Sequence, residues 1–137
     1  METINLGKKY IKHLVGNKID AKGCFHLSKT HWANLKTIEL SRWYWDYLVG
    51  NRIGAEGCSH LSNAHWPNLQ TIYLSKETIK CLDGNQIGNE GCLNLSKAYW
   101  TNLQTIWLGK ENIEYLDGNQ ISDEGCLHLS KTHWGNL

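Results

Sequence analysis

The sequence lacks an excess of charge of either sign. Fourteen lysines and arginines stand against thirteen aspartates and glutamates, which leaves a formal net charge of +1. A chain so nearly neutral has no overall field that would gather nucleic acid or anionic lipid. Any binding that depends on charge must therefore be local.

Long apolar segments are also missing. No stretch approaches the roughly 18 apolar residues that a membrane-spanning helix needs. The opening residues 1–6 contain no basic stretch followed by an apolar run, which is the pattern of a secretion signal. We therefore expect a cytoplasmic protein that has no membrane partner.

The cysteines do not form the even, clustered set of a disulfide framework. There are five, an odd number, and four of them recur every 34 residues. These four, Cys24, Cys58, Cys92 and Cys126, belong to an internal repeat. Equivalent cysteines on neighbouring units should lie near 10 Å apart, beyond disulfide reach. We expect buried structural thiols, no metal site and no cofactor.

The repeat covers the whole chain without gaps. Aligning the tryptophans Trp32, Trp66, Trp100 and Trp134 sets the units at residues 1–34, 35–68, 69–102 and 103–136, within one domain of residues 1–137. Units of this kind bury their apolar faces only against their neighbours. No capping unit is evident, because the chain starts in phase at Met1 and Leu137 opens a fifth unit.

Each unit contains signals for one strand, one turn and one helix. In the third unit, Leu69–Leu74 has apolar residues at its first, fourth and sixth places, as a half-buried strand would. Gly84 and Asn85 mark a turn, because both residue types tolerate a positive φ. Cys92 and Leu95 lie three apart in 91–96, with the acidic Glu90 near the start, which indicates a short helix.

These pieces, Leu-x-x-Ile-x-Leu, then Leu-x-x-Asn-x-Ile, then Gly-x-x-x-Leu, resemble the leucine-rich repeat family in its ribonuclease-inhibitor-like and cysteine-containing subclasses. The resemblance covers essentially the entire chain. It implies an α/β fold, a curved solenoid of four 34-residue units with a parallel β-sheet on the concave face and short helices on the convex face. In that family the asparagine of the turn bonds inward to unpaired backbone groups, a role it implies for Asn17, Asn51, Asn85 and Asn119.

The chain departs from the family by about eight extra residues per unit, Ser75 to Leu82 in the third. The strand is therefore either Leu69–Leu74 or a segment nearer Lys80–Leu82. We favour the first, because its apolar spacing matches the family. The rival fold is the tetratricopeptide repeat, whose period is also 34. Against it, the glycines would interrupt two long helices and the repeated Thr-Ile pair favours strand.

The columns identical in all units are interpreted as scaffold. We expect a core built from Leu35, Ile38, Leu40, Ile53, Leu61 and their equivalents. The tryptophan column should pack between each helix end and the next strand. A second asparagine column, Asn34, Asn68, Asn102 and Asn136, should bond backbone before each strand. The histidines that follow the cysteines should be solvated residues of the convex face.

Function should reside where the units differ while facing outward. The fifth place of each strand is Asn5, Glu39, Tyr73 or Trp107, and it should point into the concavity, where exposed aromatics favour protein interfaces. Beside it runs a basic row, and the second unit carries aromatics in its inserted loop. The candidate partner-binding residues are Glu39, Tyr73, Trp107, Arg42, Trp43, Tyr44, Lys76 and Lys110.

We therefore predict a non-catalytic scaffold that binds a protein partner through its concave face and inserted loops. An enzyme is not expected, since no nucleophile has a plausible adjacent base and there is no phosphate loop or clustered acid pair. One alternative is a structural or self-assembling repeat fragment of a larger protein, which associates through uncapped ends. A lesser alternative is nucleic-acid binding through the basic row with Tyr73 and Trp107; overall, we do not expect nucleic acid as the partner.

Overall fold

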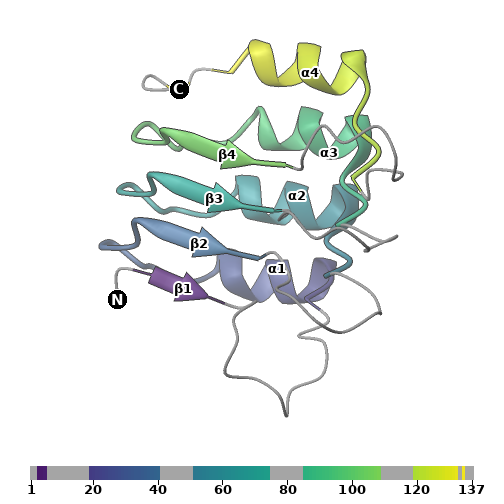
Figure 1. Cartoon of the computed structure of the whole chain (residues 1–137). Helices are drawn as coiled ribbons and strands as arrows, with labels where there is room; N and C mark the ends of the chain where they lie inside the picture. Colours follow the sequence, from purple (N-terminus) through teal and green to yellow (C-terminus); the bar gives the residue numbers. More distant parts are fainter. Residues whose placement is uncertain are drawn as a thin grey trace.

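The computed structural model of the chain describes residues 3–5, 19–40, 51–74, 85–108, 119–132 and 134. Within them, four strands alternate with four helices, which gives an α/β architecture (Figure 1). The strands are β1 (Thr3–Asn5), β2 (Thr37–Glu39), β3 (Thr71–Tyr73) and β4 (Thr105–Trp107). The helices are α1 (Ala21–Ser28), α2 (Gly54–Ser62), α3 (Gly88–Leu95) and α4 (Asp123–Ser130).

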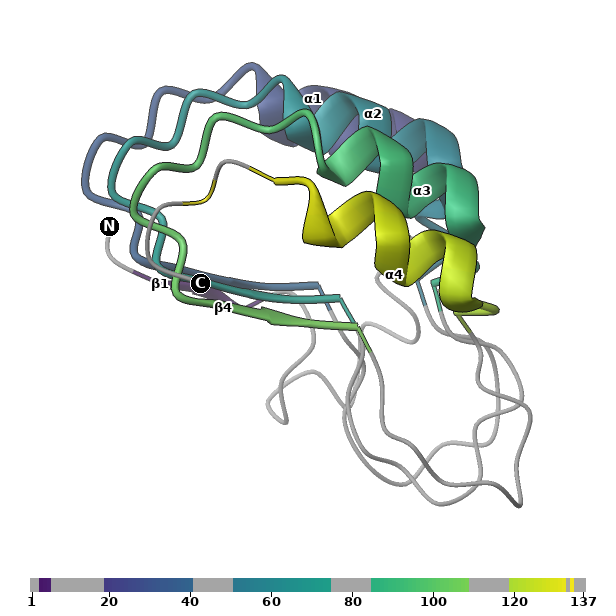
Figure 2. The ribbon, with the colours of Figure 1, turned by 90° about the horizontal axis from the view of Figure 1, so that it is seen from above.

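The strands form one parallel sheet in the order β1-β2-β3-β4. Its register pairs Thr3 with Thr37, Thr37 with Thr71 and Thr71 with Thr105. Each partner is thus the residue 34 positions along the chain, which is the period of the sequence repeat, and strands and helices alternate at that period among the described residues. Figure 2 shows the strands in one layer and the helices in another, with successive units displaced from one another.

The predicted strand is confirmed in its favoured position. The third strand, Thr71–Tyr73, lies inside Leu69–Leu74, and its β-branched Thr-Ile pair suits an extended backbone. Strands at these positions also contradict the helical rival fold. The other candidate strand, Lys80–Leu82, and the extra residues Ser75 to Leu82 lie outside the described residues.

The helix of the third unit begins three residues before the predicted start, at Gly88. Gly88 has φ +62°, a left-handed conformation that glycine adopts without a Cβ penalty. In the first unit the residue equivalent to Gly88 is Asp20, which caps the start of α1. There the Asp20 carboxylate accepts a hydrogen bond from the Gly23 N–H at 3.0 Å, as an N-cap does. Among the described residues, no helix is long and apolar enough to cross a membrane.

The core lies between the sheet and the helices, where it was predicted. Leu35, Ile38 and Leu40 come from the strand side, Ile53 and Leu61 come from the helix side, and none is more than 1% exposed. Their equivalents in the third unit are equally buried. Each such aliphatic side chain contributes about 1.5–3 kcal/mol of burial free energy.

Thiols and glycines together set how closely neighbouring helices approach. A Cβ added at Gly57 would lie 3.3 Å from Cys24 Sγ, and a Cβ at Gly91 would lie 3.3 Å from Cys58 Sγ. Cys24, Cys58 and Cys92, which we call the thiol column, are buried and unbridged, which confirms the structural interpretation for these three. Cys126 is exposed instead, because no helix among the described residues packs on the outer side of α4.

The tryptophans stack on one another along the repeat. Ring centroids are 6.0, 6.3 and 6.2 Å apart from Trp32 to Trp134, with interplanar angles of 11–22°. Trp66, Trp100 and Trp134 are buried, as expected for scaffold residues. The indole N–H of Trp66 donates to Thr30 Oγ1 at 3.4 Å, and that of Trp134 donates to the Ala98 carbonyl at 3.1 Å.

Five asparagines of the two columns donate hydrogen bonds to the backbone where the chain bends. The Asn51 side chain donates to the Leu40 carbonyl at 2.6 Å, and Asn85 and Asn119 donate to the equivalent carbonyls of Leu74 and Leu108. In the second column, Asn68 donates to the Ala33 carbonyl at 2.7 Å and Asn102 donates to the Pro67 carbonyl at 2.8 Å. These bonds satisfy turn carbonyls that no strand or helix could pair.

Candidate interaction surfaces

The outward face of the sheet carries the variable positions. Ile38 and Ile72 point into the core, so the residues on either side of each isoleucine point to the opposite face. The register aligns Asn5 with Glu39, Glu39 with Tyr73, and Tyr73 with Trp107. The structure therefore places Glu39, Tyr73 and Trp107 in one row across the sheet, as the sequence predicted. We call this row, together with Asn5, the strand row.

The strand row is less exposed than expected. Glu39 is only 6% exposed, and Tyr73 and Trp107 are half-buried. Register neighbours in a parallel sheet stand about 4.8 Å apart, so each side chain removes part of its neighbour's surface. The expectation of fully exposed side chains on this face was wrong for Glu39. The Trp107 indole N–H is buried and has no acceptor among the described residues.

The structure does not test the other predicted contact residues. Arg42, Trp43 and Tyr44 of the second unit, and the basic residues Lys76 and Lys110, lie outside the described residues. Three of the predicted contact residues are thus brought together, and the others remain predictions.

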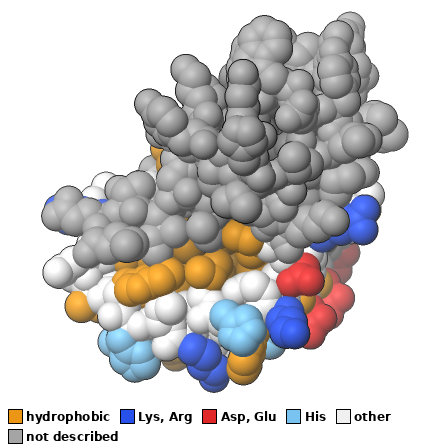
Figure 3. All heavy atoms as spheres, turned by 90° about the horizontal axis from the view of Figure 1, so that it is seen from below, with side chains coloured by type: hydrophobic (Ala, Val, Ile, Leu, Met, Phe, Trp, Pro, Cys, Tyr) orange, Lys and Arg blue, Asp and Glu red, His pale blue; other side chains and the backbone are white. Residues whose placement is uncertain are grey.

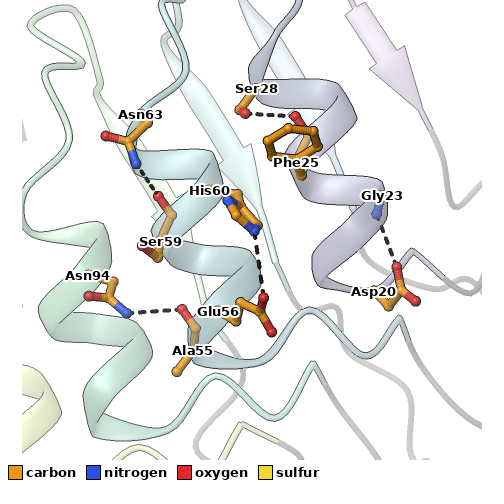
Figure 4. Close-up of polar contacts among 10 residues, drawn as sticks. All are labelled: Asp20, Gly23, Phe25, Ser28, Ala55, Glu56, Ser59, His60, Asn63 and Asn94. Carbon is orange, nitrogen blue, oxygen red and sulfur yellow. Dashed lines mark hydrogen bonds and ion pairs between the residues drawn. The ribbon is translucent and has the colours of Figure 1, made fainter.

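The outer surface of α1 and α2 contains a shallow groove (Figure 4). Its volume is about 580 Å³, and it is lined by Asp20, Lys22, Phe25, Arg52, Glu56 and His60 among others. Phe25 meets the His60 ring edge-on, with centroids 5.3 Å apart. His60 Nε2 lies 3.8 Å from Glu56 Oε1, and the equivalent pair in α4, His128 and Glu124, lies 3.9 Å apart.

The groove is open on its outer side, and both acidic and basic side chains line it. Among the described residues no group of three or more histidine, cysteine, aspartate or glutamate side chains could hold a metal ion. The histidines of the helix layer are half-buried or exposed, in keeping with their expected place on its outer surface.

The thiols of the thiol column are held in their protonated form at neutral pH. Burial raises the pKa of Cys24 to about 12, and the nearby Asp20 carboxylate adds to this shift. Burial raises the pKa of Cys92 to about 11, and it raises that of Cys58 as well. Since the thiolate is the nucleophile and the metal ligand, the raised pKa makes these thiols weak in both roles and suits their place in the packing.

A feature that was missed in the sequence is the separation of charge between the two ends of the helices. The segments that connect each helix to the next strand, residues 29–36, 63–70, 97–104 and 131–132, stack along one margin of the molecule, on the left in Figures 1 and 2. We call this margin the turn edge. It carries Lys29, Lys36, Lys97 and Lys131, and these segments contain no aspartate or glutamate.

The carboxylates cluster at the opposite ends of the helices. Apart from Glu39, those described are Asp20, Glu56, Glu90, Asp123 and Glu124, all within or just before a first helical turn. Figure 3 looks onto the end of the stack that contains α1 and shows carboxylates gathered at the right, with imidazoles to their left. The absence of acidic residues between the cysteine helix and the next strand is visible in the sequence, unit by unit.

Comparisons of the chain with protein-family models, with curated protein sequences and with solved structures found no match. The function must therefore be argued from the surfaces that the fold presents.

Proposed function

We propose that the chain is a leucine-rich-repeat-type solenoid that acts as a non-catalytic scaffold and binds a protein partner through the strand row. One strand and one short helix per 34-residue unit, a parallel sheet in strict register and an inward asparagine ladder support the solenoid. In such a stack the sheet strands lie closer together than the helices, so the sheet face becomes concave.

The observation that carries the proposal is the contrast between adjacent positions of the strands. The threonine and isoleucine of each strand are the same in all four units, whereas the next position changes from asparagine to glutamate, tyrosine and tryptophan. Packing requires the buried isoleucine. It does not require a different side chain in every unit on the outward face, so we infer that this variation serves recognition.

The chemistry of the strand row suits a protein partner. Tyrosine and tryptophan supply large, rigid contact areas and dominate interface energetics. The unpaired indole N–H of Trp107 is also a donor that a partner's carbonyl could satisfy once the ring turns toward it.

The test compares two double variants of the whole chain. Tyr73→Ser/Trp107→Ser removes the rings of the strand row, and Leu93→Ser/Leu127→Ser removes exposed apolar side chains from the helix layer as a matched control. Proteins captured from a lysate by each variant are quantified by mass spectrometry, and the enriched partner is then purified and its affinity measured directly.

We expect the strand-row variant to bind the purified partner more than about tenfold more weakly than the parent chain does, because truncation of hot-spot residues costs this much affinity. The control should bind as the parent chain does. Equal affinity of parent and strand-row variant, with circular dichroism showing both folded, would refute the proposal.

A further inference from the structure

We propose that the turn edge binds single-stranded nucleic acid, with its lysines on the phosphates and its exposed rings on the bases. This surface is distinct from the strand row, and the inference does not depend on the function proposed above. Such binding requires a local positive field, exposed rings on which bases can stack, and a repeat distance that suits an extended strand.

The field is local because the turn edge holds lysines without carboxylates. Lys29, Lys97 and Lys131 lie at or just beyond the C-terminal ends of α1, α3 and α4, and all three are exposed. None makes an ion pair with a carboxylate of the described residues; Lys97 Nζ donates to Asn94 Oδ1 at 3.3 Å, and Lys29 Nζ lies 5.1 Å from the centre of the Phe25 ring. These lysines therefore form a local basic surface, interrupted at Asn63 in the second unit, that no carboxylate of the described residues neutralises.

An exposed ring lies two residues after each helix C-terminal position, which is basic in the first and third units and asparagine in the second. His31 follows Lys29, His65 follows Asn63 and Tyr99 follows Lys97, and all three rings are exposed. Tyr99 is 91% exposed, the highest value among the large hydrophobic residues that the structure describes. Lysine at a helix C-terminus is explained by the helix dipole alone. An aromatic ring held fully in water beside it is not, because exposure forfeits the free energy that its burial would release.

The spacing favours an extended strand. The tryptophans that directly follow these rings in sequence stack with centroids 6.0–6.3 Å apart, so the turns repeat at that interval. This is well beyond the roughly 3.4 Å between stacked bases along each strand of a duplex. Rings at the longer interval, with lysines beside two of them, fit a strand whose bases are unstacked and lie on side chains.

An acidic protein segment would satisfy the lysines but leave Tyr99 without a role. A nucleic acid uses both, since base stacking on aromatic side chains accompanies phosphate contacts in proteins that bind single strands. The two partners therefore differ in their dependence on the Tyr99 ring.

The experiment measures binding of fluorescein-labelled single strands of about 12 thymidines or uridines by anisotropy, a length within the usual site size. A glutamate peptide of similar length is the competing polyanion. Lys29→Gln/Lys97→Gln removes two charges from the turn edge, and Lys22→Gln/Arg52→Gln removes two from the opposite ends of the helices. Both variants change the net charge equally.

At about 0.1 M salt, each lost phosphate contact should weaken binding about fivefold and lower the salt slope by about 0.7. The turn-edge variant should therefore bind roughly 25-fold more weakly, and the control should change less than about twofold. Tyr99→Ala should lose about fivefold or more, while Tyr99→Phe keeps its affinity. Since the Tyr99 side chain lies in water, neither of its variants should disturb folding.

Three results would overturn the proposal. The first is no binding of either single strand by the parent chain. The second is equal weakening by the two charge variants, which would indicate a general effect of net charge. The third is binding of the glutamate peptide as tightly as the oligonucleotides with no effect of Tyr99→Ala, which would assign the edge to an acidic protein segment.

Discussion

Replacing Gly91 with alanine should destabilise the protein, although alanine is the better helix former. Gly91 lies inside α3, where a solvent-facing glycine-to-alanine change gains about 1 kcal/mol of helix propensity. In this structure the new Cβ would lie 2.5 Å from Ile87 Cγ2 and 3.3 Å from Cys58 Sγ. Both neighbours are buried, so neither can move aside freely.

The magnitude follows from these two opposing effects. Overpacking of a filled core costs about 1–3 kcal/mol. After the propensity gain is subtracted from this cost, the free energy of unfolding should fall by about 1 kcal/mol or somewhat more. Gly23 is the matched control, because it occupies the same position in α1. Its added Cβ would lie 3.0 Å from Ile19 Cγ2 and meet no thiol within 4 Å.

Urea unfolding followed by far-ultraviolet circular dichroism measures both variants. We expect Gly91→Ala to unfold at lower urea than the parent chain, and Gly23→Ala to unfold near the parent or above it. If Gly91→Ala proved as stable as Gly23→Ala, crowding of the added Cβ by Ile87 and Cys58 would not be what makes glycine necessary in this column.

Three further outcomes are expected. Asn85→Ala should lower the free energy of unfolding by about 1–3 kcal/mol in urea titrations, because the buried Leu74 carbonyl loses its donor; an unchanged midpoint would contradict this. Ala64→Thr should raise the free energy of unfolding by about 0.5–1.5 kcal/mol. The Trp100 indole N–H has no acceptor among the described residues, whereas the equivalent N–H of Trp66 donates to the Thr30 hydroxyl, at the position that corresponds to Ala64. A fall in melting temperature would show that the new hydroxyl does not accept from Trp100. The free energy of unfolding should fall as pH rises above about 9, by up to about 1.4 kcal/mol per pH unit for each residue of the thiol column. The reason is that the thiols of the unfolded chain release protons which the buried thiols of the folded chain retain. A flat profile up to pH 10 in urea melts would refute the burial argument.

Much of the scaffold could be predicted, because the same pattern of strand, turn and helix residues recurs in four units. Ile38 and Ile72, the core leucines of these two units, and the turn asparagines Asn51, Asn85 and Asn119 occupy repeating positions, and their burial or backbone bonding follows from residue type and position. The strand row was also placed correctly, because side chains alternate across a strand. Its degree of exposure was not, since that depends on which side chains gather around Glu39 in space.

The glycine column shows what pattern alone could not supply. In the sequence, Gly57 and Gly91 counted only against the two long helices of the rival fold, and Gly91 opened the predicted short helix of residues 91–96. In the structure they lie within helices and receive the thiols of Cys24 and Cys58 from the preceding unit. A glycine that breaks a helix and a glycine that admits a neighbour look the same in a sequence.

The sequence by itself determined the period, the order of strand and helix in each unit and the residues of the core, because these depend on local propensity and on polarity that repeats at a fixed interval. Only the tertiary structure decided the depth of the strand row, the exposure of Cys126 and the stacking of the turn segments, with their lysines, along one edge. These properties depend on distances between units, and residues 34 positions apart become neighbours only when the units stack.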